Sequence, residues 1–130
     1  MTLLTGPTIV VIAGVFDLAF AAFHLAFWQL FGWPARLKLL DPINRPLLPV
    51  MNIALILLFC TTGIALISAP LDAYTTGFGR IILIGVSFFW LVRAIIQIWY
   101  YRLQHPASLS LFALFIVGSL LHGAAVTLGA

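Results

Sequence analysis

The chain has 130 residues, of which 64% are hydrophobic and only 7% are charged, and its formal net charge is +3. Soluble domains carry about 25% charged residues, so this composition excludes a soluble globule with an ordinary polar surface. The few positive charges are also too dispersed to form a nucleic-acid-binding surface, and no nucleic-acid partner is expected. The composition predicts an integral membrane protein that forms a single domain over residues 1–130.

Runs with few or no charges locate the membrane spans. Residues 1–35 contain Asp17 as their only formal charge, and residues 81–101 contain only Arg93, whereas residues 46–71 and 103–130 contain none. Each run exceeds the roughly 20 residues with which a helix crosses a bilayer. We expect transmembrane helices near residues 8–31, 46–68, 79–102 and 108–128. Short connections predict an all-α, antiparallel, up-down four-helix bundle.

A cleaved signal peptide is the alternative interpretation of the first run. Such a peptide begins with positive charge and has an uninterrupted apolar centre. No Lys or Arg precedes Arg36, and Asp17 interrupts the apolar segment. We therefore interpret the first run as a retained span. The one cysteine, Cys60, lies within the second span and forms no intramolecular disulfide.

Basic residues in the connections predict the orientation. Arg36, Lys38 and Arg45 lie between the first two spans, and Arg102 lies between the last two. Because short basic loops stay in the cytoplasm, we expect loops 32–45 and 103–107 to be cytoplasmic. Both termini then lie outside the inner membrane of the cell. Ser108 is expected to cap the fourth helix. An interfacial aromatic belt is expected from Trp28, Trp33, Trp99, Tyr100 and Tyr101.

Polar residues recur along one face of two of the predicted spans. Asp17 and His24 share a face of the first, and Arg93 and Gln97 share a face of the third. At 1.5 Å of rise per residue, Asp17 lies about 13 Å below the outer surface. The same count places His24, Asn52, Arg93 and Gln97 at about 21 to 27 Å.

Uncompensated charges are costly inside a bilayer, so Asp17 and Arg93 are expected to face protein and to form an internal ion pair. This pair would organise a ligand or proton site made of Asp17, His24, Asn52, Trp90, Arg93 and Gln97. Ser119 and His122 form a secondary polar group, in which Ser119 is a candidate partner for His122. No metal site and no cofactor is predicted.

These residues favour a small-ligand binding or transport module. The architecture is similar to that of the small multidrug resistance transporters, whose first span also carries a carboxylate, but the Asp17, His24 and Arg93 pattern differs and no membership is assigned. One alternative is a structural or accessory protein whose buried ion pair only fixes helix packing. A second is a quinone- or haem-binding redox subunit, although His24 and His122 differ by about 15 Å in depth.

Other functional classes receive less support from the sequence. No HExxH, GxSxG or paired-aspartate motif is present, so enzyme activity is not favoured. Expected partners are membrane lipids, a small-molecule ligand, and a further copy of the chain or another membrane protein.

Overall fold

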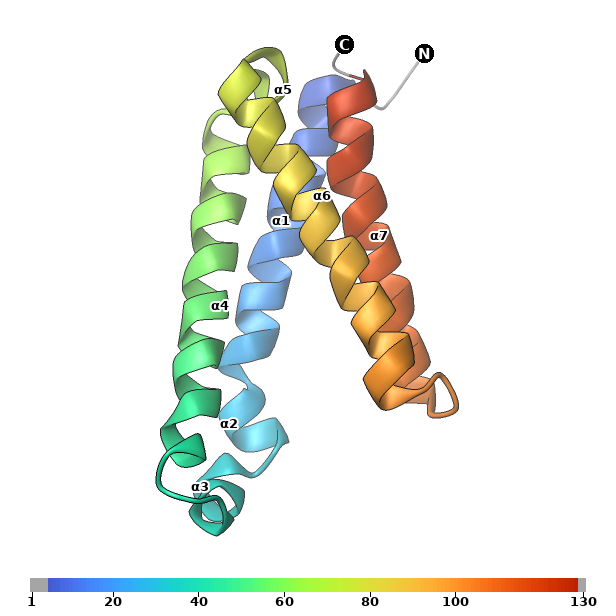
Figure 1. Cartoon of the computed structure of the whole chain (residues 1–130). Coiled ribbons are helices and arrows are strands. Elements are labelled where there is room, and N and C mark those ends of the chain that lie inside the picture. Colours follow the sequence, from blue (N-terminus) through green and yellow to red (C-terminus); the bar gives the residue numbers. More distant parts are fainter. Residues whose placement is uncertain (1–4, 129–130) are drawn as a thin grey trace. The chain divides into compact units, whose positions relative to one another are not determined.

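The computed structural model describes residues 5–128 and is almost entirely helical (Figure 1). Within that range four helical segments are long and apolar enough to cross a membrane. They are α1 (Gly6–Leu25), α4 (Asn44–Ser68), α6 (Gly77–Ile96) with its π-helical extension η2 (Gln97–Tyr101), and α7 (Pro106–Leu128). The predicted all-α class with four long apolar helices is confirmed.

Short helices fill the connections between these segments. They are α2 (Phe27–Leu30), α3 (Trp33–Arg36), the 3-10 helix η1 (Leu37–Leu39) and α5 (Pro70–Thr75). The first predicted span ran to residue 31 without a break, whereas the structure interrupts the helix at Ala26. There the amide of Ala26 is shared between the carbonyls of Ala22 and Phe23, which is the tightened last turn common at helix ends.

The chain divides into two compact units, residues 14–65 and residues 1–13 with 66–130. The predicted single domain stays a prediction. In the first unit, α1 and α4 are antiparallel, because Asp17 contacts Thr62 whereas the later His24 contacts the earlier Asn52. Gly63 makes their close approach possible, since a Cβ there would lie 2.8 Å from the Gly14 carbonyl.

In the second unit, α6 and α7 form an antiparallel hairpin. Ser87 contacts Ser119, and Gln97 contacts Ser108. An apolar core joins this hairpin to the start of α1, the end of α4 and α5. The core comprises Ile9, Val10, Ala13, Leu66, Ala73, Leu83 and Ala125. All four long helices therefore contribute residues to this core.

The turn of the α6–α7 hairpin corrects one sequence prediction. Ser108 was expected to cap the last helix, but α7 already begins at Pro106, whose fixed φ suits the first helical turn. The Ser108 hydroxyl instead donates to the Arg102 carbonyl at 2.6 Å. Arg102 has a φ of 50°, which is strained for a residue with a side chain, and this hydrogen bond helps to hold it.

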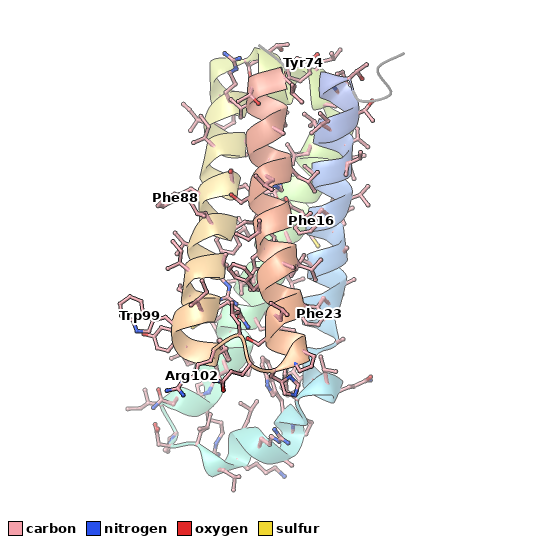
Figure 2. The ribbon with its side chains drawn as sticks, turned by 90° about the vertical axis from the view of Figure 1, so that its right-hand side faces the viewer. Phe16, Phe23, Tyr74, Phe88, Trp99 and Arg102 are labelled. Carbon is pink, nitrogen blue, oxygen red and sulfur yellow. The ribbon has the colours of Figure 1, made fainter. Side chains whose placement is uncertain are left out.

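Large apolar side chains cover the outer surfaces of the long helices. Phe88 and Trp99 point away from the α6–α7 hairpin and are 64% and 81% exposed (Figure 2). Ile53 and Leu57 of α4 are similarly exposed. Soluble proteins rarely show such extended apolar surfaces, so this distribution is typical of a multi-pass membrane protein. The orientation of the termini and loops stays a prediction.

Candidate functional site

Asp17 lies in the middle of the apolar helix α1 and has no exposed surface. Its Oδ2 atom accepts a hydrogen bond of 2.8 Å from the hydroxyl of Thr62 on α4. The same hydroxyl oxygen lies 3.0 Å from the carbonyl of Leu58, one helical turn earlier. A hydroxyl has a single proton to donate, so Thr62 can serve either the carboxylate or the carbonyl at a given moment.

Thr62 was not among the residues predicted from the sequence. Hydroxyl side chains in apolar helices normally bond to the carbonyl four residues before them, which makes them unremarkable in a membrane span. Thr61, its neighbour, does only this, with a bond of 2.8 Å to Leu57. The two threonines lie on different faces of α4, and only the placement of α4 against α1 distinguishes Thr62 from Thr61.

His24 lies two turns after Asp17 on the same helix and is half-buried. Its Nδ1 atom is 2.8 Å from the Phe20 carbonyl, and because a carbonyl only accepts, Nδ1 carries a proton. The imidazole stacks on Phe27 at 4.5 Å between ring centroids and lies 5.3 Å from Phe59 and 5.8 Å from Phe23. The aromatic rings fix the orientation of the imidazole.

Asn52 joins α4 to the end of α1. Its amide nitrogen donates a 3.0 Å hydrogen bond to the carbonyl of His24, which lies in the last turn of α1, where carbonyls have no partner within the helix. The Asn52 side chain is 5% exposed, and among the described residues its Oδ1 atom has no hydrogen-bond partner. A buried acceptor of this kind is normally satisfied by water or by a ligand.

Arg93 and Trp90 lie on α6, in the other unit. The Arg93 guanidinium lies over the ring of Phe115 on α7, at 4.8 Å from its centroid, which is a cation–π arrangement. Trp90 is buried and stacks on the same ring at 5.7 Å. Phe115 was not predicted as part of any site. Since Asp17 and Arg93 belong to different units, their ion pair stays a prediction.

Gln97 was predicted as part of the ligand or proton site, and its amide nitrogen donates to the Ser108 hydroxyl at 2.9 Å. Gln97 thus helps to close the α6–α7 hairpin. The predicted partnership of Ser119 with His122 stays a prediction. Ser119 bonds with Ser87 through its carbonyl, at 2.8 Å, and His122 Nδ1 bonds with the Gly118 carbonyl at 2.7 Å.

The structure therefore brings together three predicted site residues and one that was missed. Asp17, His24 and Asn52 lie along the α1–α4 pair with Thr62, and we call these four residues the α1–α4 polar site. Trp90 and Arg93 lie on α6 and contact Phe115 of α7, whereas Gln97 begins η2 and bonds with Ser108 at the start of α7. In residues 5–128, no group of three or more His, Cys, Asp or Glu side chains could hold a metal ion.

Comparison with known proteins finds no matching family model, no similar curated protein and no similar solved structure.

Proposed function

We propose that this chain is a small membrane-embedded binding or transport module that uses the α1–α4 polar site to exchange protons and to bind a small solute. The observation that carries the proposal is the position of the Thr62 hydroxyl, 2.8 Å from the Asp17 carboxylate and 3.0 Å from the Leu58 carbonyl. This position suits both protonation states of Asp17.

When Asp17 is ionised, Thr62 donates its proton to the carboxylate. When Asp17 is protonated, the carboxylic acid donates to the Thr62 oxygen, and Thr62 turns its own proton to Leu58. The hydrogen bond between Asp17 Oδ2 and the Thr62 hydroxyl therefore persists in both states, and no helix has to move.

The chemistry of the site favours a solute that carries hydrogen-bond donors or positive charge. The Asp17 carboxylate and the Asn52 Oδ1 atom are acceptors, and the partly exposed ring of Phe27 beside His24 offers an aromatic surface to an apolar or cationic group. We propose an amphipathic amine or organic cation as the solute class. If Arg93 pairs with Asp17, such a solute displaces the guanidinium from the carboxylate on binding.

The proposed setting of the site is a four-helix bundle in the inner membrane, with both termini outside. The basic connections 32–45 and 103–107 then lie on the cytoplasmic side. This orientation follows from the loop charges, and it is tested by labelling single cysteines placed in each connection of intact cells.

A second candidate is a purely structural role for the buried polar residues. It is favoured by Asn52 and Gln97, whose amide donors bond with the end of α1 and with the α6–α7 turn. In that case the polar side chains only fix helix pairing, and Asp17 takes no part in proton exchange.

Infrared spectroscopy separates the two candidates. The full-length protein in liposomes is compared between pH 8 and pH 5, and the band of a protonated carboxyl group is followed. Under the proposed function, lowering the pH produces this band in the wild type and in the control Asp72→Asn, but not in Asp17→Asn. A spectrum in which Asp17→Asn equals the wild type contradicts proton exchange at Asp17.

The solute class is tested with tetraphenylphosphonium as the probe. Equilibrium binding to the same liposomes should be tighter at pH 8 than at pH 5, since the probe competes with the proton for Asp17. The Asp17→Asn variant should lose this pH dependence. Binding that is equal at both pH values in the wild type overturns the assignment of a cationic solute.

A further inference from the structure

A groove of about 400 Å³ is lined by residues of α2, α3, η1 and the beginning of α4 and shares no residue with the α1–α4 polar site. Figure 1 shows α2 and α3 near the beginning of α4. We call it the loop groove. Its lining combines aromatic, rigid apolar and basic side chains, among them Trp28, Trp33, Leu37, Lys38, Arg45 and Pro49. Its volume falls within the range of about 300–1,000 Å³ that is usual for small-ligand sites.

Local sequence features give the aromatic side of the groove its shape. Gly32 adopts a left-handed conformation with φ of 58°, which turns the chain sharply between α2 and α3. The turn brings the Trp33 ring to 5.6 Å from the Trp28 ring, at an interplanar angle of 70°. Leu37, which is buried, completes this apolar part.

Hydrogen bonds fix the basic side of the groove. The Nη2 atom of Arg45 donates to the carbonyls of Lys38 and Leu40, at 3.2 and 3.1 Å. Asp41, the only acid of this connection, accepts hydrogen bonds from the Asn44 side chain and from the amides of Asn44 and Ile43. The Asn44 side chain, and then the backbone amides, lower the pKa of Asp41 from its ordinary value. The carboxylate is thus held by its neighbours in the loop.

The position of the groove indicates which molecule meets it. It lies where α1 and α2 end and α4 begins, so it lies at the membrane surface if α1 and α4 cross the bilayer. Leu39 and Ile43 of the same connection are 86% and 82% exposed, which suits contact with acyl chains. Three basic residues against one acid give residues 28–45 a positive charge. Anionic lipid headgroups are attracted to such segments.

We propose that the loop groove binds one anionic phospholipid. The phosphate lies between Lys38 and the guanidinium edge of Arg45, and the glycerol and first acyl carbons lie against Trp28, Trp33 and Pro49. The amphipathic indole rings suit this depth, where apolar chains meet the polar headgroups. The positive charges of Lys38 and Arg45 select an anionic headgroup, and the rigid aromatic and proline side chains contact the glycerol and the first acyl carbons.

The test is lipid retention by the full-length protein in mild detergent, measured by native mass spectrometry. Phosphatidylglycerol and phosphatidylcholine with identical acyl chains are titrated separately. We expect one phosphatidylglycerol molecule to be retained in preference to phosphatidylcholine. One basic residue near a membrane contributes about 1 kcal/mol, so Lys38→Gln should weaken retention about fivefold.

Arg36→Gln is the matched control, because Arg36 lies on α3 two residues before Lys38, is exposed, and does not line the groove. Its retention of phosphatidylglycerol should stay close to that of the wild type. Trp33→Leu should weaken retention of the lipid while preserving the net charge. Equal losses for Lys38→Gln and Arg36→Gln indicate general surface attraction and overturn the proposal. A lipid-insensitive dimer that Trp33→Leu dissociates also overturns it, since a second copy then fills the groove.

Discussion

Thr62 of α4 donates a hydrogen bond of 2.8 Å to the carboxylate of Asp17 on α1, although the two residues are 45 positions apart in the chain. Because membrane helices are surrounded by lipid as apolar as their own side chains, such polar contacts and close packing, rather than hydrophobic burial, decide which helices pair. The contact fixes the register of α1 against α4 and supplies the proposed proton site with its partner.

The first prediction concerns this bond. Thr62→Val keeps the shape of the side chain but removes the donor from a buried carboxylate. We expect it to lower the free energy of unfolding by about 0.5 to 2 kcal/mol. The control is Thr61→Val, because the Thr61 hydroxyl bonds only with Leu57 of its own helix and its residue is exposed. Denaturation with sodium dodecyl sulfate in mixed micelles measures the free energy of unfolding of both variants. If Thr62→Val and Thr61→Val lose equal stability, Thr62 has no specific role.

The second prediction concerns the close approach of α1 and α4. In Gly63→Ala the new Cβ would lie 2.8 Å from the Gly14 carbonyl and 2.8 Å from Leu18 Cγ. The Leu18 side chain can rotate away, but the backbone carbonyl moves only with the helix. We expect the two helices to separate and the stability to fall by about 1 to 3 kcal/mol.

Gly85→Ala serves as the control for Gly63→Ala. A Cβ at Gly85 on α6 would meet nothing within 4 Å. Alanine is the better helix former, so this variant should be neutral or more stable by up to about 1 kcal/mol. The same unfolding assay compares the two variants. If Gly63→Ala is as stable as Gly85→Ala, the inference that α1 packs closely on α4 at Gly63 is wrong.

The third prediction concerns the turn of the α6–α7 hairpin. Ser108→Ala leaves the Gln97 amide without its 2.9 Å acceptor and the Arg102 carbonyl without its 2.6 Å donor. Both partners belong to a turn with a strained residue, so we expect a loss of about 1 to 3 kcal/mol. Ser110→Ala, at an exposed position whose hydroxyl bonds only with Pro106, should change stability by less than about 0.5 kcal/mol. Proteolysis at the turn offers a local measurement: cleavage should accelerate in Ser108→Ala alone.

The sequence was sufficient to predict the helices but only part of the site. An apolar run of more than 20 residues that crosses a bilayer must satisfy its own backbone hydrogen bonds, and a helix does so. The four long apolar helices could therefore be predicted. Asp17 and Arg93 stood out because formal charges are rare in such runs. Asn52 was predicted because an amide in an apolar span also needs a partner.

The residues that were missed lack any local signal. Thr62 differs from Thr61 only in the helix face that it occupies, and that difference matters only once α1 is placed against α4. Phe115 is one of 11 phenylalanines, and its contact with Arg93 depends on the register of the α6–α7 hairpin. The Gln97 to Ser108 bond depends on the π-helical end of α6, which follows from tertiary contacts rather than from helix propensity.

The fourth prediction is the ion pair between Asp17 and Arg93, the charged side chains that the sequence places within the spans. Removing either charge leaves its partner unpaired in a low-dielectric surrounding, which is strongly destabilising, whereas removing both relieves the penalty. We therefore expect Asp17→Asn and Arg93→Gln each to lower detergent stability by about 3 to 5 kcal/mol, and the double variant to lose less than the sum.

The double-mutant cycle has a matched comparison in Asp72 and Arg36, an acid and a base whose side chains are exposed. Asp72→Asn and Arg36→Gln should have small, additive effects, because mutations at sites that share no partners usually add within about 0.5 kcal/mol. A coupling energy for Asp17 and Arg93 of at least about 1 kcal/mol, against this baseline, supports the pair. Additive losses for Asp17 and Arg93 would show that the Arg93 guanidinium is stabilised by the Phe115 ring and its surroundings rather than by the carboxylate.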